Sequence, residues 1–320
     1  MTRTILVVGE LRGGQPSSAT RELLGAASQI AAGGPVGITL LGAGATSAAS
    51  ACTGATVAYV NDSADYDAFR AEQWLAAIGA AMDALGPDTV LVSQDVSGRQ
   101  IAPRLAHRRS TAAAMDCTQI ADDGGVLRVT RPAYGGNALA TYTFATAPAI
   151  VTVREKSFDA NEAGSVPTDI VALPPPGPSR VQITKTERAA AEGLRLEDAP
   201  IVVSGGRGLG GPEGFEVLKQ LVDVLGRDRA TLGASRAAVD LGWCSPSIQV
   251  GLTGKVVAPN LYIAIGISGA SQHMAGCAGS RAIVVINRDA DANMLGFARY
   301  ALIGDYRQIV PALVQALRGD

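Results

Sequence analysis

The chain has 320 residues, and its 27 basic and 29 acidic side chains give a formal net charge of −2. This balance excludes the strongly basic surface by which proteins hold nucleic acid or anionic membranes. A hydrophobic content of 47% suffices for large cores, and at roughly 150 residues per domain the length favours two domains. The 38 glycines indicate many tight turns and close approaches of the backbone to a ligand.

The sequence shows no sign of membrane insertion or of a metal centre. No apolar run approaches the length of about 20 residues that crosses a bilayer, and Ile5–Val8 is short enough to be a first strand. The cysteines lack the clustered spacing of a zinc, iron–sulfur or disulfide framework: Cys52, Cys117, Cys244 and Cys277. With His107 and His273 as the two histidines, we expect a metal-free cytoplasmic protein that binds no nucleic acid.

The first half of the chain alternates short apolar runs with longer amphipathic segments. The expected strands are Ile5–Val8, Val36–Leu41, Thr56–Val60 and Thr89–Val92, and the expected helices are Ser18–Ala32, Tyr66–Leu85 and Ala102–His107. Further strands follow at Thr141–Phe144 and Ile150–Val153, before a proline-rich stretch at 173–178. Such alternation favours βαβ units and a parallel sheet. We place a domain boundary near 195 and interpret residues 1–195 as an N-terminal α/β scaffold and partner-docking domain.

The second half, residues 196–320, restarts the alternation. The expected strands are Ile201–Ser204, Ala230–Ala234, Ser247–Val250, Leu261–Ile267, Ala282–Asn287 and Tyr300–Ile303. Helices are expected at Glu213–Leu225, from near Ala270, and from Asp305 to Leu317. Two of the strands are apolar almost throughout, as in strands buried on both faces. The predicted fold is therefore α/β with two domains, each a mostly parallel sheet with flanking helices, and the C-terminal domain is doubly wound.

Polar and glycine residues follow the strands of this second domain. In open parallel sheets ligands bind beyond the carboxyl ends of the strands, so these residues predict a crevice for a phosphate-bearing ligand. The stretch GRGLGG at 206–211 matches G-x-G-x-x-G, yet a phosphate loop and a plain turn remain equally open there. The next strand ends in Ser235 and Arg236 without the acid that holds the ribose of NAD, which disfavours a nicotinamide site.

Three side chains in this crevice have both a structural and a functional interpretation. Arg207 and Arg236 stand at separate strand ends beside small residues, which favours contact with an anion over two solvated charges. His273 falls in the first turn of an expected helix, where unpaired N–H groups attract anions, although a lone histidine is usually structural. Lys255 is the one lysine near these strand ends.

At these residues the chain resembles the α subunit of electron-transfer flavoproteins. The resemblance rests chiefly on LYIAIGISGASQH at 261–273, with VGLTGK at 250–255 and IVVIN at 283–287. It extends to SGGRG at 204–208, GASRAAVD at 233–240, GRQIAPR at 98–104, RPAYGGN at 131–137 and VREKSF at 153–158. It thus covers nearly the whole chain and is strongest from 201 to 310.

The resemblance implies a heterodimer with a β subunit that carries FAD mainly in the C-terminal domain of this chain. It further implies an electron carrier, not an enzyme, between flavin dehydrogenases and a membrane quinone oxidoreductase, with no catalytic residue. Carried over by position, the residues that hold the dinucleotide are Arg207, Ser235, Gln249, Ser268, Asn287 and Asp305. Those around the isoalloxazine are Arg236, Thr253 and His273. Further cofactor contacts are expected from Val250, Gly251, Leu252, Gly269, Ala270, Ser271, Gln272 and Tyr306.

The roles expected from this resemblance follow from charge. A reduced flavin gains negative charge near N1 and the C2 carbonyl, which Arg236 and His273 would stabilise, while the Thr253 hydroxyl would bond to N5. The chain departs from the family pattern at Leu252, where glutamine is usual, at Ser271, usually apolar, and at Arg299 and Ala301, where aspartate and glycine are common. The departure at Leu252 puts one polar contact to the flavin in doubt.

Two other hypotheses compete with the simple carrier. The chain could be the α subunit of an electron-bifurcating NADH-dependent complex, in which a second flavin and the NADH site would lie on the β subunit. Alternatively, it could be an unrelated transferase on the same dinucleotide fold, similar to deoxyhypusine synthase, with Lys255 as a Schiff-base lysine. Flavin reduction by NADH distinguishes the first, and copurification of flavin argues against the second.

Overall fold

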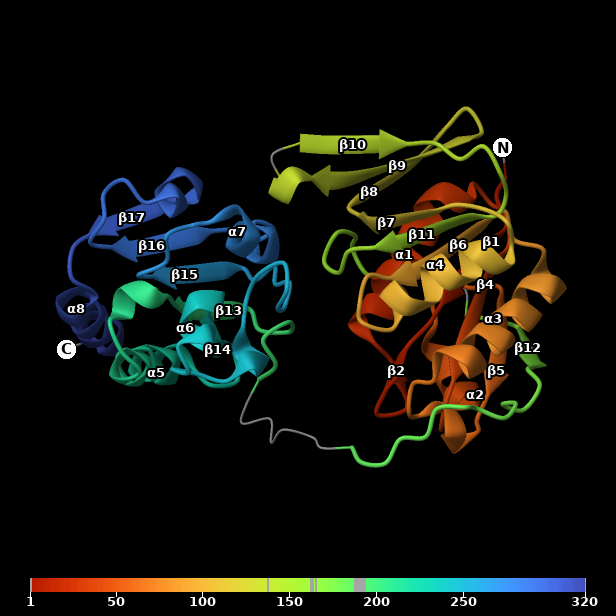
Figure 1. Cartoon of the computed structure of the whole chain (residues 1–320), viewed down its shortest axis with the longest axis horizontal. Helices are drawn as coiled ribbons and strands as arrows, with labels where there is room; N and C mark the ends of the chain where they lie inside the picture. Colours follow the sequence, from red (N-terminus) through yellow and green to blue (C-terminus); the bar gives the residue numbers. More distant parts are fainter. Residues whose placement is uncertain (1, 137, 162–163, 165, 187–193, 320) are drawn as a thin grey trace. The chain divides into compact units, whose positions relative to one another are not determined.

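In a computed structural model, which describes residues 2–136, 138–161, 164, 166–186 and 194–319, the chain forms two compact units (Figure 1). Unit 1 consists of Met1–Tyr134 with Ala138–Thr186, and unit 2 of Gly135–Asn137 with Glu187–Asp320. Across the described residues, none of the helices combines the length and the apolar composition needed to traverse a bilayer.

Unit 1 is built on a seven-stranded sheet in the order β12-β5-β4-β1-β6-β11-β7, with every neighbouring pair parallel. These strands are β1 (Ile5–Val8), β4 (Val36–Leu41), β5 (Val57–Asn61), β6 (Thr89–Ser93), β7 (Ala113–Cys117), β11 (Ala149–Val153) and β12 (Asp169–Ala172). An antiparallel three-stranded sheet follows β7 and contains β8 (Gln119–Asp123), β9 (Val126–Ala133) and β10 (Ala138–Tyr142). A small antiparallel pair joins β2 (Leu11–Arg12) to β3 (Gln15–Pro16).

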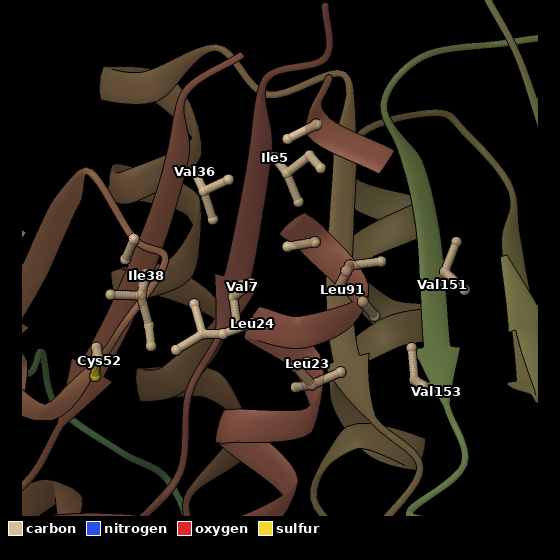
Figure 2. Packing of buried hydrophobic residues seen from close by; sticks show 14 of the residues in the cluster. Ile5, Val7, Leu23, Leu24, Val36, Ile38, Cys52, Leu91, Val151 and Val153 are labelled. Atoms are coloured by element: carbon tan, nitrogen blue, oxygen red, sulfur yellow. The ribbon is translucent and has the colours of Figure 1, made fainter. Parts of the chain in front are cut away.

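Helices cover both faces of the large sheet because successive side chains of each strand point to opposite faces. Ile5 and Val7 of β1 pack with Leu24 of α1 (Ser18–Ala31) in one buried cluster, which Figure 2 shows. Leu6 and Val8 belong to the opposite cluster, beneath α3 (Ala71–Leu85) and α4 (Gly98–Arg108). The remaining helix of unit 1, α2, is a single short turn at Ala45–Ala48.

Unit 2 is an open five-stranded parallel sheet in the order β14-β13-β15-β16-β17. Its strands are β13 (Ile201–Gly205), β14 (Ala230–Ala234), β15 (Leu261–Ile265), β16 (Ile283–Asn287) and β17 (Tyr300–Ile303). Its helices are α5 (Glu213–Leu225), α6 (Arg236–Asp240), α7 (Ser271–Cys277) and α8 (Tyr306–Arg318). α5 and α8 pack on one face of this sheet and α7 on the other, so the expected doubly wound α/β architecture is confirmed.

The expected strand at Ser247–Val250 is wrong. Pro246 opens a 3-10 turn, Pro246–Ile248, and the hydroxyl of Ser245 accepts a hydrogen bond from the Ser247 N–H at 3.2 Å. Proline has no N–H to offer a strand partner, and a serine before it favours a cap over a sheet ladder. Only single bridges form there, from Gln249 to Ala234 and from Val250 to Lys255. The expected helix at Tyr66–Leu85 begins later, at Ala71, after a separate 3-10 turn at Ala64–Tyr66.

Candidate functional site

The strand order of unit 2 has a switch point between β13 and β15. The chain passes from β13 to β14 on one side and later returns to β15 on the other, so the loops after β13 and β15 diverge there. All five strands are parallel, and their carboxyl ends therefore share one edge of the sheet. Ligands of such folds bind at this edge, outside the switch point.

At the switch point, the glycine backbone of the loop after β13 packs so closely against the end of β15 that no side chain fits between them. The Gly206 N–H donates to the Ile265 carbonyl and the Gly208 N–H to the Gly266 carbonyl, both at 2.9 Å. A Cβ on Gly206 would lie 2.3 Å from the Gly266 oxygen, and one on Gly208 would lie 2.8 Å from the Gly266 Cα. Gly266 itself has a φ of +61°, which favours glycine. The loop after β13 thus lies directly against the end of β15.

Main-chain and side-chain hydrogen bonds continue this edge across the sheet. The Ser235 N–H donates to the Gly205 carbonyl and the Val250 N–H to the Ala234 carbonyl, both at 2.9 Å. On the other side, the Asn287 amide donates to the Ile267 carbonyl at 3.0 Å. We call this edge the carboxyl rim, and it comprises residues 205–210, 235–236, 249–255, 266–273, 287–289 and 304–306.

The segment from Gln249 to Lys255 forms a tight turn in the carboxyl rim. The Gln249 amide donates to the Thr253 hydroxyl at 3.1 Å, and the Lys255 N–H donates to the Gln249 carbonyl at 2.7 Å. The Leu252 N–H donates to the Gln272 carbonyl at 2.8 Å, which fixes the turn against the start of α7. Leu252 is 43% exposed, so its apolar side chain lies at the surface where the family pattern has glutamine.

The positive charges of the carboxyl rim are exposed. Arg207 is exposed and forms no ion pair with any residue that the structure describes. The Arg236 side chain is 67% exposed, and its Nε lies 3.3 Å from the Asp240 carboxylate one helical turn away. An exposed pair of this kind contributes only about 0.3–0.5 kcal/mol, so Arg236 is easily redirected to a ligand.

Asp305 caps α8 and also pairs with an arginine. Its carboxylate accepts a hydrogen bond from the Arg307 N–H at 2.9 Å and contacts the Arg288 guanidinium. These partners hold the pKa of Asp305 below its usual value, the Arg307 N–H having the largest lowering effect. Asn287 is likewise engaged within the protein, since its side-chain oxygen accepts from the Asp289 N–H at 3.1 Å.

His273 is buried, with 7% of its surface exposed. Burial lowers its pKa from 6.5 to about 4, because an imidazolium cation loses its hydration there. The imidazole is therefore neutral at pH 7. A neutral His273 adds no positive charge to the carboxyl rim and offers hydrogen bonding alone, and its expected place beside the isoalloxazine stays a prediction.

Two of the expected contact residues point into the protein. Val250 is 1% exposed and packs in the apolar cluster under α7, so only its backbone faces the carboxyl rim. Tyr306 is 4% exposed, and its hydroxyl donates to the Leu209 carbonyl at 2.8 Å, which anchors the loop after β13. The fold places the other expected contacts on the carboxyl rim: Gly251, Thr253, Ser268, Gly269, Ala270, Ser271 and Gln272. Their contacts with a cofactor remain predictions.

Lys255 of the carboxyl rim has an acidic partner that the sequence did not predict. Lys255 forms an ion pair with Glu197, a carboxylate with only 12% of its side chain exposed. Burial raises the pKa of Glu197, but the hydrogen bond and charge of Lys255 outweigh it and the net pKa is lowered. A charged, paired Lys255 is unlike a Schiff-base lysine, which reacts as the neutral amine. No spacing in the sequence joins residues 197 and 255.

The pKa of His273 makes unit 2 sensitive to acid. Unfolded histidine takes up a proton near pH 6.5, whereas buried His273 stays neutral to about pH 4, so stability falls as the pH drops through this window. At pH 5 this loss amounts to roughly 2 kcal/mol. We expect His273→Gln to remove that part of the loss between pH 7 and pH 5. Urea unfolding followed by Trp243 fluorescence in a Trp74→Phe background measures it, and equal pH dependence in both proteins contradicts the prediction.

Comparisons with known proteins assign the family. Residues 5–202 match the electron transfer flavoprotein domain, and residues 195–278 match the electron transfer flavoprotein FAD-binding domain. The chain is 38% identical to the electron transfer flavoprotein subunit alpha of Thermoanaerobacterium thermosaccharolyticum, over 99% of this chain and 98% of that protein. It is 37% identical to that of Pseudomonas aeruginosa, over 98% and 99%. It is also 33% identical to that of Bacillus subtilis, over 99% and 98%.

The residues of the carboxyl rim fit FAD. The close contact of the glycines keeps side chains away from the backbone at the switch point, and Arg207 is exposed beside it. The buried Nδ1 of His273 has no hydrogen-bond partner among the described residues. The FAD-binding family model covers the glycine contact, the turn at Gln249–Lys255 and the first turn of α7. The chain belongs to the electron-transfer flavoprotein α-subunit family, and FAD is its cofactor.

Proposed function

We propose that this chain pairs with a β subunit and carries electrons from flavin dehydrogenases, such as acyl-CoA dehydrogenases, to a quinone-linked membrane oxidoreductase. The observation that carries the proposal is the composition of the carboxyl rim, which combines bare glycine backbone, exposed arginines and a neutral buried histidine. FAD supplies the electron-accepting ring system when bound. The rim side chains then hold the dinucleotide and adjust its electrostatics, without a nucleophile or a general base of their own.

Each rim residue has an assigned part in holding FAD. Arg207 contacts the phosphates, supported by its exposure and by its lack of an ion pair with any described residue. Ser235, Gln249, Ser268, Asn287 and Asp305 complete the dinucleotide site. Arg236, Thr253 and His273 surround the isoalloxazine. Leu252 replaces a polar neighbour of that ring with an apolar one.

Unit 1 serves as the scaffold that docks the β subunit. Its antiparallel sheet exposes large apolar side chains at the end of β9 and along β10, namely Tyr134 at 85%, Leu139 at 66% and Tyr142 at 46%. Apolar side chains gathered on a surface are typical of protein–protein interfaces. The large parallel sheet gives this arm a rigid base, since β7 continues into β8 within two residues.

A titration with NADH tests the carrier role against electron bifurcation. We expect the flavin of the assembled heterodimer to be reduced by dithionite, and by a flavin dehydrogenase with its substrate, but not by NADH alone. Stopped-flow absorbance at the flavin band measures each rate. Rapid reduction by NADH contradicts the carrier role and indicates the bifurcating alternative.

Gly206→Ala tests the switch point as the FAD site. A Cβ placed 2.3 Å from the Gly266 oxygen forces the two loops apart, at a cost of about 1–3 kcal/mol. We therefore expect FAD to bind about tenfold or more weakly, measured by flavin fluorescence during titration of the apoprotein. The control is Gly296→Ala, at a glycine with open space around its Cβ position. Equal FAD affinity in both variants contradicts the site.

Arg236→Ala tests the source of positive charge at the flavin. Loss of the cation destabilises the reduced, negatively charged ring, so we expect a lower flavin midpoint potential with FAD still bound. The matched control is Arg227→Ala, which breaks an exposed ion pair of the same i,i+4 spacing, with Asp223 of α5. Spectroelectrochemistry of the heterodimer measures both. An unchanged potential in Arg236→Ala contradicts the role of this arginine.

A further inference from the structure

A buried polar pair lies beneath the carboxyl rim. Tyr262 of β15 is fully buried, and its hydroxyl lies 2.9 Å from Nε2 of His273 in the first turn of α7. The two rings are tilted at 58° with centroids 6.1 Å apart. Val257 and Met274 lie in the same apolar cluster, and the Ser204 hydroxyl and the Cys277 thiol are further polar groups beside the Tyr262 hydroxyl. Removal of either partner of a buried hydrogen bond costs free energy, because the other partner is left buried without a hydrogen bond.

At neutral pH the pair has two protons to place, one on the Tyr262 hydroxyl and one on the imidazole of His273. Burial raises the pKa of the Tyr262 hydroxyl well above 10, so this group keeps its proton. Burial also lowers the pKa of His273 to about 4, so the imidazole is neutral and has one proton to place. Either Tyr262 donates to Nε2 and the ring proton is on Nδ1, or Nε2 carries the proton and Tyr262 accepts it.

The surroundings of Nδ1 decide between these tautomers. Nδ1 is buried without a hydrogen-bond partner among the described residues, and the Val250 carbonyl is near enough to oppose the fall in the His273 pKa. A carbonyl oxygen repels a ring lone pair and attracts an N–H, which favours a proton on Nδ1. Nε2 then keeps its lone pair, and the Tyr262 hydroxyl is the donor that meets it.

The backbone of the first turn of α7 packs against the rim turn. A Cβ on Gly251 would lie 3.6 Å from the His273 Cα, and the Leu252 N–H binds the Gln272 carbonyl at 2.8 Å. The turn that contains Thr253 is thus packed on the helical turn that contains His273.

We propose that Tyr262 is a positioning residue, whose hydroxyl donates to Nε2 and fixes His273 as the neutral tautomer with its Nδ1 proton toward the Val250 carbonyl of the rim turn. The inference rests on the proposed function, because it needs FAD at the carboxyl rim. In this arrangement His273 acts on the ring as a neutral N–H dipole held in one orientation, and Arg236 supplies the positive charge. No ionisation of His273 then contributes to the flavin potential between pH 5.5 and pH 8.

Nitrogen NMR tests the tautomer directly. The chain has two histidines, and His107 lies exposed on α4, so His107→Gln leaves His273 as the single signal. The chain is labelled with 15N-histidine and assembled with FAD and unlabelled β subunit, and solid-state spectra are recorded at pH 5.5, 7 and 8. We expect a protonated Nδ1 and an unprotonated Nε2 at all three pH values. A protonated Nε2, or a doubly protonated ring, overturns the proposal without use of any Tyr262 variant.

Tyr262→Phe tests the positioning role. Without the hydroxyl donor, we expect a substantial population with the proton on Nε2 and a lower midpoint potential, while FAD affinity stays within about threefold. Tyr59→Phe is the matched control, since Tyr59 is 5% exposed in unit 1 and its change should leave both readouts unaltered. An unchanged tautomer or an unchanged potential in Tyr262→Phe overturns the proposal.

Failure of the proposed function gives a different result. If FAD does not bind at the carboxyl rim, the flavin band is absent from the assembled wild-type heterodimer, whereas the tautomer of His273 is still read from the same 15N spectra. The tautomer and the site are therefore judged independently.

Discussion

Contact between glycine backbones at the ends of β13 and β15 determines the arrangement of the carboxyl rim. Gly206 and Gly208 donate hydrogen bonds to the end of β15, and neither has room for a Cβ there. The contact brings the loop with Arg207 against the loop that leads into α7, at the one point where the strand order reverses. The bonds from Ser235, Val250 and Asn287 extend this edge without a gap across the sheet.

The carboxyl rim has an exposed charged side chain, Arg236, and a buried neutral one, His273. The Arg236 guanidinium is exposed to solvent and pairs with Asp240, which is itself exposed. His273 is neutral because burial disfavours the imidazolium cation, and it can still form directional hydrogen bonds. Under the proposed function, a flavin that gains negative charge on reduction would lie near the exposed guanidinium of Arg236 and the buried, neutral imidazole of His273. This combination suits a carrier, which must stabilise the reduced ring without proton transfer to a substrate.

Much of this arrangement follows from local patterns in the sequence. Apolar strands such as Ile283–Asn287, ended by glycine or polar residues, indicate a parallel sheet and its ligand edge, and family motifs then name the cofactor. What could not be predicted depends on contacts between distant residues. Prediction of the Tyr262–His273 pair would require both the strand register and the start of the helix. From the sequence alone, one tyrosine in an aliphatic strand indicates only a core residue. At Pro246 a local signal was decisive, because the cap formed by Ser245 and the proline start a 3-10 turn where a strand was expected.

The most direct test of the account is the flavin content of this chain purified with its β subunit. Visible absorption, with native mass spectrometry of the same sample, gives the number of FAD molecules per heterodimer. We predict one FAD, whose binding is lost or weakened when Gly206 is changed and retained when Gly296 is changed. A heterodimer without FAD after incubation with the cofactor, or one whose FAD is indifferent to the carboxyl rim, would contradict this prediction.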